Sequence, residues 1–66
     1  MRGIERRLQI INRIQELGTA EVNELAELYQ VSTMTIRRDL AKLEEDGLIR
    51  IEYGGAVLNR GTLFEY

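Results

Sequence analysis

Hydrophobic positions near the start of the chain follow the three- and four-residue spacing of an amphipathic helix. The stripe consists of Ile4, Leu8, Ile11 and Ile14, and Ile10 and Leu17 widen it. Arg7 lies within this stripe, where its stem can pack while its guanidinium group reaches water. We expect the helix to end at Gly18, since glycine adopts the left-handed conformation common at helix C-termini.

Two more helices are predicted after a short link. Residues 19–22 are too few for more than an extended segment, at most a single edge strand. Asn23 is a favourable N-cap for a short helix over residues 24–29, and residues 30 and 31 form the turn that follows. Ser32 caps a longer helix, which runs to about Asp46 and stops at Gly47.

The longer helix is predicted to have one buried and one exposed face. Leu40 and Leu43 fall close to Ile36 around the helix axis, so these three side chains define the buried face. Met34 and Arg38 lie on the opposite face.

Charged residues at two places of this helix need partners. The acidic residues 44–46 oppose the helix macrodipole at its C-terminal end, so tertiary packing must hold that end. Asp39 lies among arginines, and we expect it to pair with one of them in a structural role.

After the third helix the hydrophobic pattern changes to that of strands. Residues 48–52 alternate from Ile49 onward, residues 56–58 form a second apolar run, and Tyr53-Gly54-Gly55 lies between them. Two such runs joined across glycines predict a β-hairpin. The predicted core consists of Ile11, Ile14, Leu25, Leu28, Ile36, Leu40 and Leu43.

The predicted fold is mainly α with a small β-hairpin, and its second and third helices form a helix-turn-helix unit. The second helix of such a unit, here the third helix of the chain, enters the DNA major groove with its N-terminal residues at the base edges. Hydroxyl, methionine and arginine side chains suit phosphates, thymine methyl groups and guanine. The candidate DNA-binding residues are Ser32, Thr33, Met34, Thr35, Arg37 and Arg38, together with Lys42 and Arg50.

Composition narrows the function classes. A chain of 66 residues forms one small domain with a compact core. It contains no apolar run long enough to cross a membrane and its start lacks a signal-peptide core, so a cytoplasmic location is the default. Without cysteine or histidine it lacks zinc ligands and a base for a hydroxyl nucleophile. We therefore expect no metal, no cofactor, no catalytic residues and no enzymatic activity.

Several short stretches resemble the N-terminal domain of the DeoR family of bacterial repressors. They are Glu24-Leu25-Ala26, Val31-Ser32, Thr35-Ile36-Arg37-Arg38-Asp39-Leu40, Leu43-Glu44, Gly47-Leu48 and Gly54-Gly55-Ala56. The resemblance extends from about residue 6 to residue 58, and residues 35–40 are its most specific part.

The resemblance implies a three-helix winged helix-turn-helix over residues 1–58. It places the helix-turn-helix at about 21–39, the recognition helix at about 32–46 and the wing at about 48–58, with residues 59–66 as a tail or the start of a linker. It further implies a repressor of sugar or related catabolic genes that binds double-stranded operator DNA. In the family a C-terminal domain, absent here, senses an effector such as a phosphorylated sugar, and the intact repressor is a homo-oligomer.

The wing departs from the family pattern. Tyr53 replaces the usual histidine before the two glycines, and Ile51 replaces an arginine that is common two residues earlier. Glu52 adds a negative charge, which leaves Arg50 and Arg60 as the only cations of this region. Whether this wing contacts DNA is left open by the sequence.

The bulk charge favours a second function class. A net charge of -2 and an isoelectric point near 5.1 are unusual for a DNA-binding domain. A winged-helix module for protein–protein interaction, without DNA binding, shares the same fold. The arginines of the recognition helix favour DNA.

The apolar stripes are predicted to be used up in a single core. We therefore expect the chain alone to be a monomer or weak dimer that binds one half-site and ignores sugar phosphates. Because it ends a few residues after the wing, we expect it to be part of a longer protein.

Overall fold

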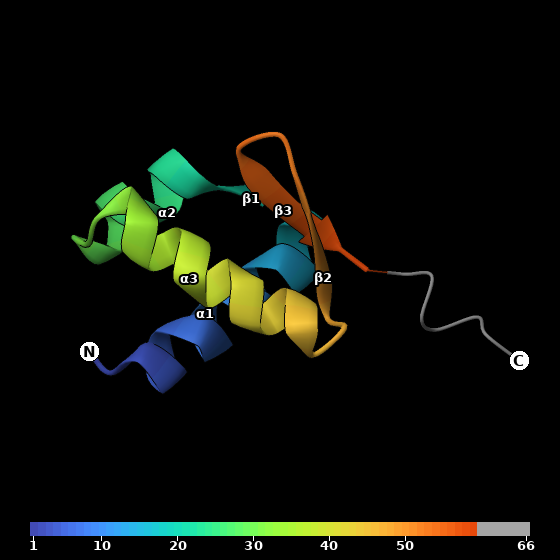
Figure 1. Ribbon diagram of the computed structural model, residues 1–66, viewed down its shortest axis with the longest axis horizontal. Helices are drawn as coiled ribbons and strands as arrows, with labels where there is room; N and C mark the ends of the chain where they lie inside the picture. The colour runs from blue at the N-terminus through green and yellow to red at the C-terminus, as the bar shows by residue number, and fades with distance from the viewer. Residues whose placement is uncertain (60–66) are drawn as a thin grey trace, which may run out of the picture.

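The computed structural model describes residues 1–59 and consists of three helices and a three-stranded antiparallel sheet (Figure 1). In chain order the elements are α1 (Gly3–Leu17), β1 (Thr19–Glu21), α2 (Val22–Tyr29), α3 (Thr33–Glu45), β2 (Ile49–Glu52) and β3 (Gly55–Leu58). The predicted fold class is confirmed, and the extended link before α2 adds a strand to the hairpin. Residues 60–66, which include the predicted wing cation Arg60 and all of the predicted tail after residue 59, lie outside the described residues.

Local signals in the sequence set most helix ends as predicted. Gly18 has a φ of 84°, and its N–H donates to the carbonyl oxygen of Ile14 at the end of α1. The Ser32 hydroxyl oxygen accepts a hydrogen bond of 3.1 Å from the Thr35 N–H, which caps α3. Gly47 has a φ of 79° just after α3.

The predicted start of α2 is wrong by two residues. The helix begins at Val22, and Asn23 lies inside its first turn instead of capping it. Val22 is buried, and its N–H donates a 2.9 Å hydrogen bond to the carbonyl oxygen of Gly54 in the hairpin turn. A tertiary contact with the hairpin therefore satisfies one of the first N–H groups of α2, which have no partner within the helix.

The sheet has the order β1-β3-β2, so the last strand in the sequence lies in the middle. Tyr53 and Gly54 form the two-residue turn of the hairpin, where Gly54 has a φ of 67°. Gly55 lies in β3 opposite Glu21, and a Cβ there would collide with the carbonyl oxygen of Ala20. The two glycines therefore have different roles, one in the turn and one in close strand packing.

One core joins all the elements. Its buried apolar residues are Ile10, Ile11, Ile14, Ala20, Val22, Leu25, Ile36, Leu40, Leu43, Ile49 and Ala56. Leu28 was predicted to belong to it but is 53% exposed, because its part of α2 faces an open hollow instead of another helix.

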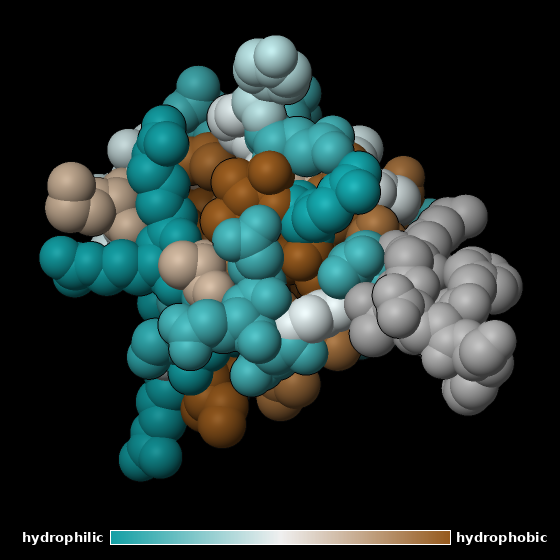
Figure 2. Space-filling view, turned by 45° about the vertical axis from the view of Figure 1, so that its right-hand side comes forward, coloured by the Kyte–Doolittle hydropathy of each residue, from teal (hydrophilic) through white to brown (hydrophobic). Residues whose placement is uncertain are grey.

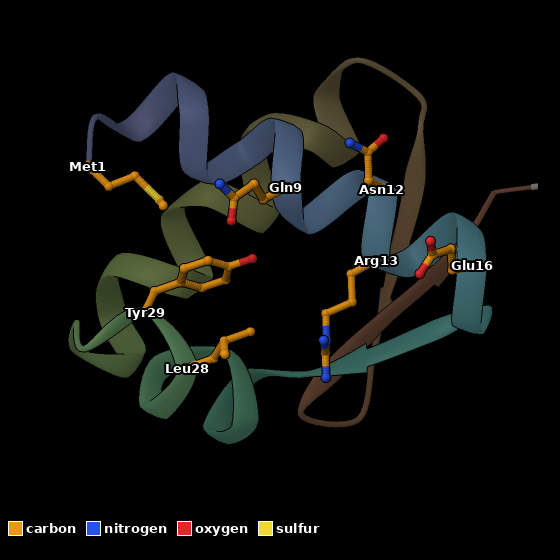
Figure 3. A pocket seen from close by; sticks show the side chains of 7 residues that line it. All are labelled: Met1, Gln9, Asn12, Arg13, Glu16, Leu28 and Tyr29. Carbon is orange, nitrogen blue, oxygen red and sulfur yellow. The ribbon is translucent and has the colours of Figure 1, made fainter.

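That hollow lies between α1 and α2 and has a volume of about 510 Å³. Figure 3 shows Leu28 and Tyr29 on one side of it and side chains of α1 on the other. Ile4, Leu8 and Leu17 are each about 60% exposed, so the expectation that the apolar stripes are used up in the core is wrong. Hydrophobic side chains are visible at the surface among hydrophilic ones (Figure 2).

Asn59, which follows β3, is hydrogen-bonded to the domain. The N–H of Asn59 donates to the carbonyl oxygen of Leu48, and its side-chain amide donates to that of Gly47. None of the helices in residues 1–59 is both long and apolar enough to cross a membrane.

Candidate nucleic-acid interface

The exposed side chains of α3 form the centre of the candidate interface. Six predicted contact residues lie at the cap or on the first two turns of this helix. Of these, Ser32, Thr33, Met34, Arg37 and Arg38 are exposed, and Thr35 is half-buried. Ser32 and Thr35 share a 3.0 Å hydrogen bond between their hydroxyl groups, so the cap orients two of the polar groups together.

Met34 and Arg38 lie one turn apart on the face opposite the core. Met34 is 60% exposed, and a terminal nitrogen of Arg38 lies 3.9 Å from its sulfur atom. Ile36 and Leu40, on the inner face, are fully buried. The same helix therefore anchors itself in the core and presents an arginine and a thioether outward.

Asp39 is the single buried charged residue among residues 1–59, and it connects α3 to α1. Both of its carboxylate oxygens accept hydrogen bonds from Arg6, one from Nε and one of 3.2 Å from Nη2. Arg7 Nη1 donates a longer bond of 3.4 Å to Oδ1. The hydrogen bond to Asp39 raises the pKa of the Arg6 guanidinium above its ordinary value, and burial acts in the opposite direction. Arg6 is therefore charged at neutral pH.

The sequence predicted an arginine partner for Asp39 but not which one. The partners come from 32 and 33 positions earlier in the chain, not from the neighbouring Arg37 or Arg38. One signal was available, because Arg7 interrupts the apolar stripe of the first helix. Arg6 lies beside it and carries the stronger contacts, but sequence reasoning overlooked Arg6.

The wing packs against the other side of α3. Arg37, Ile51 and Gly54 are among the residues that line a hollow of about 150 Å³ between helix and hairpin. Glu44 Oε2 accepts a 2.9 Å hydrogen bond from the N–H of Ile51. This bond connects the acidic end of α3 to the edge strand β2 and gives one of its acids a partner, as the predicted tertiary packing requires.

The wing carries an exposed ion pair on β2 and an exposed tyrosine at its tip. Arg50 lies on β2, and its guanidinium group forms a 2.8 Å ion pair with Glu52. Both side chains are exposed, at 65% and 47%. Tyr53 is fully exposed at the tip of the hairpin. Within residues 1–59 no cluster of three potential metal-binding side chains occurs.

Three helices, of which α3 is capped and exposed on one face, and a hairpin wing define a winged helix-turn-helix domain. The chain belongs to the family described as the DeoR-like helix-turn-helix domain, whose model matches residues 6–62. The resemblance noted in the sequence is thereby confirmed.

Relatives of the chain are bacterial transcriptional repressors. A protein named as the aga operon transcriptional repressor in Escherichia coli O157:H7 is 54% identical over 58 residues, which cover 88% of this chain and 22% of that protein. The transcriptional repressor CsqR of Escherichia coli K12 is 48% identical over 82% of this chain and 21% of its own length. The lactose phosphotransferase system repressor of Streptococcus mutans is 42% identical over all of this chain and 26% of its own length.

The chain spans about a fifth to a quarter of the length of these relatives. No solved structure matched it. The family and the relatives place the chain with DNA-binding transcription regulators.

Proposed function

We propose that this chain binds double-stranded operator DNA in a sequence-specific manner as the DNA-binding domain of a bacterial transcription repressor, with α3 in the major groove. The observation that carries the proposal is the exposed start of α3, where Met34 and Arg38 project from a helix fixed by Asp39. A side chain reads base edges only if its helix is held in a fixed position.

The predicted contact residues take two kinds of role. Because they lie at the start of α3, we assign to base edges and the nearest phosphates the residues Ser32, Thr33, Met34, Thr35, Arg37 and Arg38. Lys42 lies further along α3 and Arg50 on the wing, so we assign both to phosphates. Arg50 has to exchange its ion pair with Glu52 for a phosphate to do so.

The regulated genes are proposed from the names of relatives. Two of the relatives named above are repressors of the aga operon and of the lactose phosphotransferase system. We infer that the intact protein represses sugar or related catabolic genes in the cytoplasm, where the DNA is. We assign the response to an effector such as a phosphorylated sugar to the part of the protein outside this chain. We assign its assembly into a homo-oligomer to the same part.

A protein–protein interaction module is the second candidate, and only the acidic isoelectric point near 5.1 favours it. The cations at the start of α3 and the repressor relatives support DNA binding instead.

The test is selection of bound duplexes from a pool with a randomised centre, followed by anisotropy titrations on a selected and an unselected duplex. We expect preference for the selected duplex and about three to five neutralised phosphates per monomer, hence a slope of log affinity against log salt of roughly -3 to -5. Absence of binding, or affinity that does not change with salt, contradicts the proposal and favours the protein-interaction module.

A further inference from the structure

The recognition helix has a different element on each flank. Thr35, Asp39 and Lys42 lie in one row along α3, and the start of α1 covers that row where Arg6 and Arg7 reach Asp39. Arg37 lies on the other side, beside the turn of the wing. We call these the α1 flank and the wing flank.

Both flanks lie close to phosphates if α3 enters the major groove. An α-helix with its side chains is about 10–12 Å wide, and the major groove is about 12 Å wide. The helix therefore fills the groove, and protein atoms beside it meet the phosphates that line the two groove walls. The charge of each flank decides what it does there.

Both flanks carry positive charge, but they arrange it differently. On the wing flank the cation of β2, Arg50, is paired with Glu52, so the excess charge there is that of the exposed Arg37 of α3. On the α1 flank two guanidinium groups share the single carboxylate of Asp39, which leaves one positive charge in excess at that cluster. Lys42 is exposed in the same row of α3 and adds a further cation.

Arg7 is the arginine of this cluster that can bind a ligand. Arg6 contacts both oxygens of Asp39 and its side chain is only 12% exposed. The Arg7 side chain is 24% exposed and makes one bond, of 3.4 Å, through a single nitrogen. Because a guanidinium group has five N–H donors, most of those of Arg7 remain for an anion. Gly3 leaves room for both groups, since a Cβ there would lie 3.1 Å from Arg7 Nη1.

We propose that the α1 flank holds a binding site for a DNA backbone phosphate. Arg7 binds the phosphate, and Asp39, itself bonded to Arg6, positions the Arg7 guanidinium group. The site deepens the proposed function and rests on it. Positioning matters because a preorganised guanidinium group loses less conformational freedom when it binds a phosphate than a free one does. The site contacts the backbone and reads no sequence.

The test compares Arg7→Ala with Arg13→Ala in salt titrations of the 66-residue chain on a selected and an unselected duplex. Arg13→Ala is a matched control, because this substitution removes the same charge from the same helix. Its side chain lies in the hollow lined by α1, α2 and Met1 (Figure 3).

For Arg7→Ala we expect the salt slope to fall by about 0.9 and the affinity to fall roughly five- to tenfold near 0.1 M salt, equally for both duplexes. Arg13→Ala should leave the slope unchanged within error. Arg7→Lys should restore most of the slope, because lysine keeps the charge.

Circular dichroism and thermal unfolding show whether each variant is folded. Asp39 keeps both bonds to Arg6 in Arg7→Ala, so this variant should fold. If it does not fold, the test rests on Arg7→Lys. A salt slope for Arg7→Lys that is lower by about 0.9 than that of the unsubstituted chain then overturns the site. An Arg7→Ala variant that matches Arg13→Ala, or that loses affinity only for the selected duplex, also overturns it. If the unsubstituted chain binds no duplex, the proposed function fails as well, whereas normal binding of the unsubstituted chain confines the failure to this site.

Discussion

Adjacent residues of the recognition helix have opposite environments. Arg38 is exposed, and Asp39, about 100° further around the helix, is 3% exposed and bonded to α1. In the proposed function α3 reads bases with one face, so its other faces must hold it in place. In this chain the holding contacts are partly apolar, through Ile36 and Leu40, and partly ionic, through Asp39.

Replacing Arg38 with alanine tests its assigned role at a base edge. Because Arg38 projects away from the core, Arg38→Ala should leave folding intact and weaken binding to the selected duplex by about 1–3 kcal/mol. Binding to an unselected duplex should change less, so the preference between the two relaxes. Paired titrations measure both, with Lys42→Ala as the variant expected to weaken all duplexes alike. Equal losses on both duplexes for Arg38→Ala would assign it to the backbone.

Single residues were predictable where the signal is local. Ser32 as a cap and Gly18 as a helix end depend on neighbours within four positions, and the structure confirms both. The partners of Asp39 depend on how two helices cross, and a hydrophobic pattern does not contain that crossing. Leu28 fits the apolar spacing of its helix, but the neighbouring element that would bury it is absent at that place. All eight proposed DNA contacts remain predictions.

At the scale of elements, the wing is attached to both helices of the helix-turn-helix. Val22 at the start of α2 donates to Gly54, and Glu44 near the end of α3 accepts from Ile51. The sequence predicted the hairpin from its alternation and glycines, but not these bonds. They also explain the misplaced start of α2, since the hairpin, which follows later in the chain, supplies the partner of its first N–H.

Gly55→Ala tests the close packing of β1 on β3. The added Cβ meets the Ala20 carbonyl, so the strands must separate, and we expect the free energy of unfolding to fall by about 1–3 kcal/mol. Gly54→Asn is the comparison, because asparagine tolerates the left-handed backbone of the turn, where a Cβ meets no atom within 4 Å. Urea unfolding followed by circular dichroism measures both. A Gly55→Ala variant as stable as the parent chain would show that the strands do not approach this closely.

The ion pair of the wing can be tested by removing its acid. Glu52→Gln keeps the side-chain shape and frees Arg50, so we expect tighter binding to every duplex and a salt slope larger by up to about 0.9. Stability should change by less than about 1 kcal/mol, because the pair is exposed. Glu24→Gln on α2 makes the same change of net charge away from the wing. Equal gains in both variants would attribute the effect to net charge alone.

For the whole molecule, the net charge of -2 hides an uneven distribution. The exposed cations of α3 are Arg37, Arg38 and Lys42, whereas the two residues that end the helix and its C-cap, residues 44–46, are all acidic. The bulk isoelectric point therefore says little about which face meets DNA.

One recognition helix reads too few bases for tight binding, so the affinity of the single chain should be weaker than about 10⁻⁸ M. Two copies joined by a flexible linker should bind paired half-sites about 10²- to 10⁴-fold more tightly than one copy, through effective concentration alone. Titrations on single and paired half-sites, with sedimentation to establish that one copy is monomeric, measure this. The control is a joined pair with Arg38→Ala in one copy, which should lose most of the gain. A joined pair no tighter than one copy would contradict the half-site interpretation.

The central position of β3 has a consequence for the time at which this domain forms during synthesis. β3 is the last element of the described chain, yet both β1 and β2 pair only with it. When all three helices of a growing chain have left the ribosome, β3, the strand that joins β1 to β2, is still missing. Because ribosomes add about 5–20 residues per second, the helices wait only a few seconds for it. Until Leu58 emerges, the nascent recognition helix has no completed scaffold behind it.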